Sequence, residues 1–255
     1  MLSSIEILIL AAIQGITEFL PVSSAAHLIL VAKYYSFNNQ NLLIDICLHL
    51  GSLIAIIVYF RKDLFDLTKN KNFLTKIIIG TLPIIPLGFF LYESNLIEHF
   101  RSLEIIGWTS LIFGIFLYIS DKIKVKKKIE ENFSTRNAIT IGIFQVLALI
   151  PGVSRSGITI TAARALGFNR FDSAKISFFL AIPTLAAASL LGIYNIYKQE
   201  STELNFLAII AVIFSAMFSF LTIALFLNFI KKFSLNIFIF YRIVLSIGIL
   251  LIAYL

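Results

Sequence analysis

Two long apolar stretches of this sequence are each interrupted by a proline, several hydroxyl side chains and a charged residue. The first interruption is QGITEFLPVSSAAH, residues 14–27, and the second is PGVSRSGITIT, residues 151–161. A charged side chain at bilayer depth costs about 2.5–3.5 kcal/mol on insertion scales. A chain this hydrophobic has little reason to carry that cost without a function. We therefore expect the two interruptions to meet and to form one site.

The composition is typical of a helical membrane protein. Hydrophobic residues make up 59% of the 255 residues, whereas soluble domains contain about 45–50%. The apolar runs are continuous rather than alternating, which favours helices over a barrel. The net charge of +7 fits basic cytoplasmic loops, and no basic face with interleaved aromatics indicates a nucleic-acid partner. The lone Cys47 allows neither a disulfide nor a cysteine-based metal site within the chain.

Each interruption predicts a re-entrant hairpin made of two short helices. A span needs about 20 residues, and residues 5–20 and 24–35, which a proline separates, are each too short. Residues 137–150 and 156–166 repeat this pattern around a second proline. The other apolar runs predict about six transmembrane helices, at residues 44–60, 77–92, 104–120, 174–197, 206–230 and 237–255.

Basic residues set the orientation of these helices. Residues 61–76 contain five Lys or Arg, residues 122–128 contain five Lys, and Lys231 and Lys232 follow another apolar run. The positive-inside rule places all three segments in the cytoplasm, so the first hairpin enters from outside and the second from inside. The sequence thus predicts an all-α integral membrane protein with an inverted-topology repeat and its site at the repeat interface. We expect a single domain, residues 1–255, with pseudo-repeats 1–120 and 137–255.

The second interruption predicts a cradle for an oxyanion. A helix that starts near Ser156 presents free N–H groups and the positive end of its dipole. Arg155 adds a planar fork that suits phosphate, and Ser154 and Thr159 add hydroxyls. The alternatives are that Arg155 snorkels or pairs with Glu18 for packing alone, and that the two serines are helix caps.

The first interruption offers groups for catalysis. Ser24 and His27 share a helix face, so they could act as nucleophile and base, or His27 could attack phosphorus itself. Glu18 could bind a divalent cation, orient His27 or act as base, and Gln14 could bind metal or phosphate. The alternatives are that His27 lies at the membrane interface, that Glu18 pairs with Arg155 for structure alone, and that Gln14 forms a polar contact between packed helices.

Two further polar pairs receive structural interpretations. Asp45 and His49 lie one turn apart on the first full span and are expected to form structural hydrogen bonds. Tyr241 and Arg242 stand near the start of the last span and are expected to anchor it at the membrane interface.

The interruptions resemble the signatures of the undecaprenyl-diphosphate phosphatase family, the bacterial bacitracin-resistance lipid phosphatases. The first signature, Glu or Gln followed by Glu four residues later and then by Pro-Val-Ser-Ser-x-x-His, stands here as residues 14–18 and 21–27. The second, Pro-Gly-x-Ser-Arg-Ser-x-x-Thr, stands as residues 151–159. Because both spacings and the overall length agree, the resemblance covers the whole chain.

The resemblance implies an enzyme of the bacterial plasma (inner) membrane that hydrolyses undecaprenyl diphosphate to the monophosphate and inorganic phosphate. This reaction recycles the lipid carrier for cell-wall synthesis and confers bacitracin resistance. The resemblance also implies a divalent cation, Mg²⁺ or Ca²⁺, and a homodimer. Counting spans back from Arg61 places the active pocket on the outer side of the membrane.

Residue by residue, the resemblance implies catalytic roles for Glu18, Ser24, His27 and Arg155. It also implies roles for Ser154 and Thr159. Altogether we expect substrate contacts from Gln14, Ser23, Ser154, Arg155, Ser156 and Thr159, and metal contacts from Glu18 and Gln14. Gln14 stands where many family members carry Glu, which removes one negative charge from the expected metal site. The sequence does not choose between Ser24 and His27 as the nucleophile.

Two other functions compete with hydrolysis. Inverted repeats with broken helices also occur in transporters, so the same pocket could flip a polyprenyl phosphate. A nucleophile beside an arginine favours hydrolysis, because a carrier needs no nucleophile. A purely structural membrane subunit would leave the buried charges unexplained. The sequence leaves lipid chain length, metal identity and oligomeric state open.

Overall fold

The structure of the chain, a computed structural model, describes residues 3–34, 42–69, 71–94, 96–198 and 206–255. Within these ranges the chain forms helices joined by short loops, and the only β-type pairing is an isolated bridge between Lys127 and Phe168. The prediction of an all-α protein is therefore confirmed. The helices are α1 (Ser4–Thr17), α2 (Ser24–Tyr34), α3 (Leu42–Tyr59), α4 (Arg61–Lys69), α5 (Lys71–Thr81), α6 (Ile84–Glu93), α7 (Leu96–His99), α8 (Leu103–Asp121), α9 (Ile129–Asn132), α10 (Thr135–Val146), the 3₁₀ turn η1 (Leu147–Leu149), α11 (Arg155–Ala165), α12 (Arg170–Lys198), α13 (Phe206–Lys232) and α14 (Asn236–Tyr254).

Five helical stretches in the described part of the chain are long and apolar enough to cross a membrane. They correspond to five of the predicted spans, while the sixth, residues 44–60, is helix α3, whose apolar part is shorter. The turn between α5 and α6 falls at Pro83, which cannot donate a backbone hydrogen bond to continue a helix. The five stretches are Lys71–Glu93, Leu103–Asp121, Arg170–Tyr194, Phe206–Lys232 and Asn236–Tyr254.

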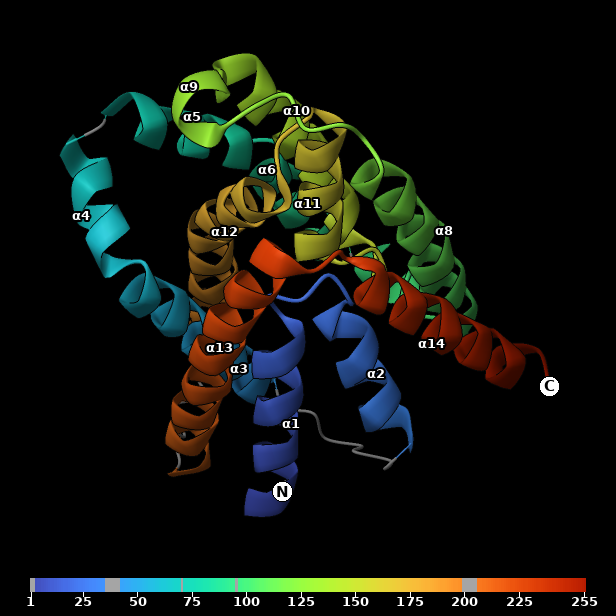
Figure 1. Cartoon of the computed structure of the whole chain (residues 1–255). Helices are drawn as coiled ribbons and strands as arrows, with labels where there is room; N and C mark the ends of the chain where they lie inside the picture. The colour runs from blue at the N-terminus through green and yellow to red at the C-terminus, as the bar shows by residue number, and fades with distance from the viewer. Residues whose placement is uncertain (1–2, 35–41, 70, 95, 199–205) are drawn as a thin grey trace.

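The two predicted hairpins are present. α1 and α2 form the first, and α10 and α11 form the second. In Figure 1, α1 rises from the N-terminus with α2 beside it, whereas α10 and α11 lie on the opposite side of the molecule. The broken ends of the hairpins meet between them, where Ser156 donates a hydrogen bond to the backbone carbonyl of Leu20 (2.7 Å).

The two hairpins share one local design at their first helix. Ser3 caps α1 by accepting a hydrogen bond from the N–H of Glu6, and Ser134 caps α10 by accepting from the N–H of Asn137. Such caps satisfy N–H groups that have no partner within the helix. The last long helix of each half, α8 and α14, pack against each other, and Figure 1 shows them side by side.

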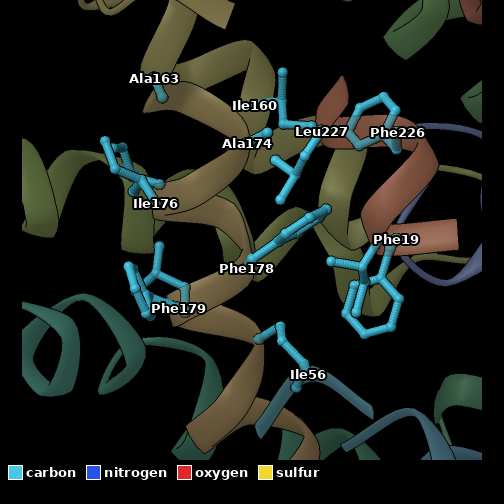
Figure 2. Close-up of a cluster of buried hydrophobic side chains, with 14 of the residues drawn as sticks. Phe19, Ile56, Ile160, Ala163, Ala174, Ile176, Phe178, Phe179, Phe226 and Leu227 are labelled. Atoms are coloured by element: carbon cyan, nitrogen blue, oxygen red, sulfur yellow. The ribbon is translucent and has the colours of Figure 1, made fainter. Parts of the chain in front are cut away.

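An aromatic core fixes the first break in place. Phe19 is fully buried and packs edge-on against Phe178 of α12, with ring centroids 5.3 Å apart. Phe178 also contacts Phe226 of α13, and Figure 2 shows this cluster of apolar side chains. Edge-to-face contacts of this kind add to the dispersion gained by close packing. Since Phe19 lies between Glu18 and Leu20, this packing also holds the catalytic candidate Glu18.

A glycine allows α1 to lie directly against α13. A Cβ atom built on Gly15 would lie 2.5 Å from the Cβ of Phe218 and 2.8 Å from the backbone nitrogen of Ser219. No side chain other than hydrogen fits at this distance, as is common where membrane helices pack closely. The close contact fixes the rotation of α1, and thus buries the neighbouring Gln14 completely.

Candidate active site

Glu18 lies at the centre of the junction between the hairpins. Its carboxylate accepts hydrogen bonds from Arg155 Nη2 (2.7 Å), Ser24 Oγ (2.7 Å) and Gln14 Nε2 (3.1 Å). Glu18 is only 7% exposed, and a buried charge needs such partners to offset its lost hydration. The predicted meeting of the two interruptions is therefore present as an ion pair between them.

Two serines shape the breaks. Ser23 and Ser154 have φ angles of 76° and 72°, a backbone conformation that is uncommon for residues other than glycine and typical of functional sites. Each hydroxyl accepts a hydrogen bond from an N–H in the helix that follows, of Ala26 and of Gly157 respectively. These turns place the next residues, Ser24 and Arg155, at the first positions of α2 and α11, where the helix dipoles favour an anion.

The guanidinium of Arg155 is held on several sides. Besides the ion pair with Glu18, Nη1 donates to the carbonyl oxygen of Ser177 (3.3 Å). The guanidinium carbon also lies 5.8 Å from the centroid of the Phe19 ring, close enough for a cation–π contact. The side chain keeps 11% of its surface exposed, so a rigid cationic fork remains accessible.

A cavity of about 260 Å³ opens beside this junction. Both hairpins and α3 contribute polar side chains to its wall, and α6, η1 and α12 add mainly apolar ones. A second cavity of about 220 Å³ shares His49, Ala25 and Pro151 with the first and extends to Asp45 and Arg101. The polar residues of the first cavity are Glu18, Ser23, Ser24, His49, Ser154, Arg155 and Thr184.

Three of the expected substrate contacts lie behind the cavity wall. The hydroxyl of Ser156 donates to Leu20, and that of Thr159 donates to Ser177 Oγ (2.7 Å) and to the carbonyl oxygen of Arg155. Gln14 is fully buried under Glu18. These side chains support Glu18 and Arg155 rather than line the cavity, which differs from the contacts expected from the sequence.

His27 lies away from the cavity. Its Nδ1 bonds to the carbonyl oxygen of Ser23 (2.7 Å), and its Nε2 bonds to the hydroxyl of Tyr241 (2.6 Å), whose ring stacks on the imidazole. Ser24 instead donates to Glu18. In the described residues, the Ser24–His27 pair that the spacing indicated is therefore not formed, because each side chain has another partner.

Arg242 supports the site, and the sequence interpretation placed it wrongly. It is not an interfacial anchor but is fully buried. Its guanidinium donates to the carbonyl oxygens of Gly152 (2.9 Å), Val153 (3.1 Å), Ser110 (3.2 Å) and Pro21 (3.4 Å). It therefore ties the backbones of both breaks to α14. Arg242 is a charged residue inside an otherwise apolar span. The argument that singled out Arg155, the cost of a charge at bilayer depth, could have singled out Arg242 as well.

The residues fit a divalent cation only as partial ligands. Within the described ranges, no group of three His, Cys, Asp or Glu side chains is placed to hold a metal. However, Gln14 Oε1 is buried without a hydrogen-bond partner, and it neighbours the carboxylate of Glu18. Mg²⁺ typically binds one or two protein oxygens and takes its other ligands from substrate phosphates and water. Glu18 and Gln14 match that pattern.

Comparisons with known proteins give one consistent result. Residues 7–248 match the family described as bacitracin resistance protein BacA. The undecaprenyl-diphosphatase of Pelagibacter ubique is 53% identical over 251 residues, which cover 98% of each chain. The undecaprenyl-diphosphatase of Saccharophagus degradans is 40% identical, and the match covers 94% of each chain. That of Hahella chejuensis is 39% identical, and the match covers 96% of this chain and 97% of the relative.

Proposed function

The chain belongs to the family of the bacitracin resistance protein BacA, and from this membership we infer that it is an undecaprenyl-diphosphatase. It is a multi-pass membrane protein that hydrolyses undecaprenyl diphosphate to the monophosphate and inorganic phosphate. The reaction returns the lipid carrier to cell-wall synthesis. The observation that carries the chemistry is the placement of Glu18, Ser24 and Arg155 around one cavity at the hairpin junction.

We propose that Ser24 is the nucleophile. Its hydroxyl donates to Glu18 Oε2 at 2.7 Å, so the carboxylate is in place to take the proton as Oγ attacks the terminal phosphorus. The new bond joins Oγ to phosphorus, and the bond from phosphorus to the bridging oxygen breaks. Undecaprenyl monophosphate leaves with the electron pair. Arg155 and the α11 N-terminus stabilise the negative charge that develops on the phosphoryl oxygens.

The contacts of His27 support this choice over histidine as nucleophile. A carbonyl oxygen can only accept a hydrogen bond, so Nδ1 of His27, which bonds to Ser23, carries the proton. The lone pair of Nε2 then accepts from the hydroxyl of Tyr241. Because both ring nitrogens are engaged, His27 would have to leave these partners before it could attack phosphorus.

Glu18 and Gln14 would hold a divalent cation, Mg²⁺ or Ca²⁺, which when bound would neutralise charge on the diphosphate. The chain's own residues orient the substrate: Ser23 and Ser154 line the cavity beside the phosphate site, and Ser156 and Thr159 hold the second break from behind.

We further propose that the protein lies in the inner membrane, that its pocket faces the outer side, and that it forms a homodimer. The lysine-rich segment at residues 122–128 supports the orientation through the positive-inside rule. An outward pocket suits a lipid carrier that is left after glycan transfer on the outer face. The proposal of a homodimer rests on the family resemblance. Light scattering of the purified protein in detergent, which measures the mass of the assembly, tests it.

Phosphate release from a C55 diphosphate by detergent-purified protein tests the function. We expect turnover by the unchanged chain, loss of turnover in Ser24→Ala, and normal turnover in the control Ser94→Ala, an exposed serine at the end of α6 whose hydroxyl donates to the carbonyl oxygen of Leu91. A transporter would release no phosphate in this assay, because moving the lipid breaks no phosphorus–oxygen bond, and detergent offers no second compartment to move it to. Normal turnover in Ser24→Ala would exclude Ser24 as nucleophile.

A further inference from the structure

His49 of α3 lies on the walls of both cavities at the hairpin junction. Of the described residues that line the larger cavity, only Glu18, a carboxylate, and His49, an imidazole, carry side chains of the kind that act as general bases. The guanidinium of Arg155 offers only hydrogen-bond donors, and the remaining polar residues are hydroxyls. The cavity therefore presents two bases, which come from different elements.

A hydrogen bond to the backbone of its own helix orients the His49 ring. Nδ1 lies 2.8 Å from the carbonyl oxygen of Asp45, one turn earlier on α3. Since that oxygen can only accept, Nδ1 carries the proton of the neutral ring and Nε2 carries the lone pair. No described residue forms a hydrogen bond with Nε2 in the structure. His27 differs in this respect, because Tyr241 occupies its Nε2.

The proposed reaction needs a second base. Attack by Ser24 leaves its proton on Glu18, and a protonated carboxyl group cannot also take a proton from water. The phosphoserine must then be hydrolysed by a water molecule that loses a proton as it attacks. The larger cavity, which Ser24 and His49 both line, has a volume of about 260 Å³, ample room for this water molecule.

We propose that His49 is a further catalytic residue, the base that activates this water; the inference rests on the proposed role of Ser24. Water oxygen bonds to phosphorus, and its proton passes to Nε2 of His49. The bond from phosphorus to Ser24 Oγ breaks, and Oγ takes back the proton held by Glu18. Inorganic phosphate leaves and carries off the proton from His49, which restores both bases.

The test follows labelled phosphate on the protein. Purified protein in detergent is mixed with undecaprenyl diphosphate that carries ³²P in its terminal phosphate, quenched at millisecond to second times, and the label on Ser24 is measured. In His49→Gln we expect steady turnover to fall by about 10²-fold while labelling of Ser24 keeps its rate and rises toward one phosphate per chain. The control His99→Gln, an exposed histidine on α7, should behave like the unchanged chain.

A second variant separates a base from a structural role. His49→Ala enlarges the space between the two cavities, so added imidazole should restore turnover and discharge the labelled serine. Lost turnover without accumulation of phosphoserine, or no rescue by imidazole in a variant that still labels Ser24, would overturn the role of His49. No label on Ser24 in any active variant would instead overturn Ser24 as nucleophile, so the two failures are distinguishable.

Discussion

The carboxylate of Glu18 and the guanidinium of Arg155 form a 2.7 Å ion pair that joins the two broken hairpins. Both groups are largely buried, and each stands beside a turn with a serine at positive φ. Removing one member of such a pair leaves an uncompensated charge. The pair therefore links the two hairpins, and the proposed reaction would use its two charges.

Replacement of Arg155 by lysine should reduce kcat/KM by roughly tenfold to a hundredfold. Lysine keeps the positive charge but lacks the planar fork that reaches Glu18, Ser177 and a phosphate at once. A lost charge-assisted hydrogen bond is worth about 1.5–3 kcal/mol. Steady-state phosphate release measures the effect, and Arg136→Lys on the exposed face of α10 is the control. Near-normal turnover in Arg155→Lys would assign Arg155 a purely structural role.

Activity should require a divalent cation that Glu18 binds. Excess chelator should abolish phosphate release, and Glu18→Gln should raise the cation concentration needed for half-maximal rate or abolish activity. In Gln14→Glu we expect a lower half-maximal cation concentration, because a second carboxylate replaces the unpartnered amide oxygen. Titration of phosphate release with Mg²⁺ and Ca²⁺ measures both effects. Unchanged activity in excess chelator contradicts the cation requirement.

The sequence predicted the hairpins and their meeting point because proline, buried charge and helix length are local properties. It could not show which partner each side chain would find. Tyr241 reaches His27 from the last span, and Ser177 reaches Thr159 from α12. These contacts depend on how helices rotate against each other, which close packing at positions such as Gly15 decides. Hence the predicted Ser24–His27 pair is absent among the described contacts, although both residues were identified.

Arg242→Met should destabilise the fold by about 3 kcal/mol or more. Methionine fills similar volume but leaves backbone carbonyls of both breaks without their donor, and each buried unsatisfied acceptor costs about 1–3 kcal/mol. We expect a lower Tm in detergent and a lower kcat, with a smaller loss in Arg242→Lys. Exposed Arg136→Met serves as control. An unchanged Tm in Arg242→Met would show that Arg242 does not hold the breaks.

Ser154→Gly should be more stable than Ser154→Ala. Both variants lose the hydroxyl that caps the N–H of Gly157, at a cost of about 1 kcal/mol for alanine and less for glycine. Alanine must also keep the positive φ of 72°, whereas glycine adopts it readily. Thermal unfolding of the two variants measures the difference. A higher Tm for alanine than for glycine would contradict the strained turn.

The active pocket should be reached from outside the cell. The lysine-rich segment 122–128 is expected in the cytoplasm, and the backbone N–H of Lys126 there bonds to Gly167 at the far end of α11, at the opposite end from Arg155 and the pocket. With Cys47 replaced, single cysteines at Asn39 and Thr202, both outside the described residues, should react with an impermeant thiol reagent in intact cells. A cysteine at the exposed Lys126 should react only after lysis. Labelling at Lys126 with protection at Asn39 would invert the orientation and place the pocket on the cytoplasmic side.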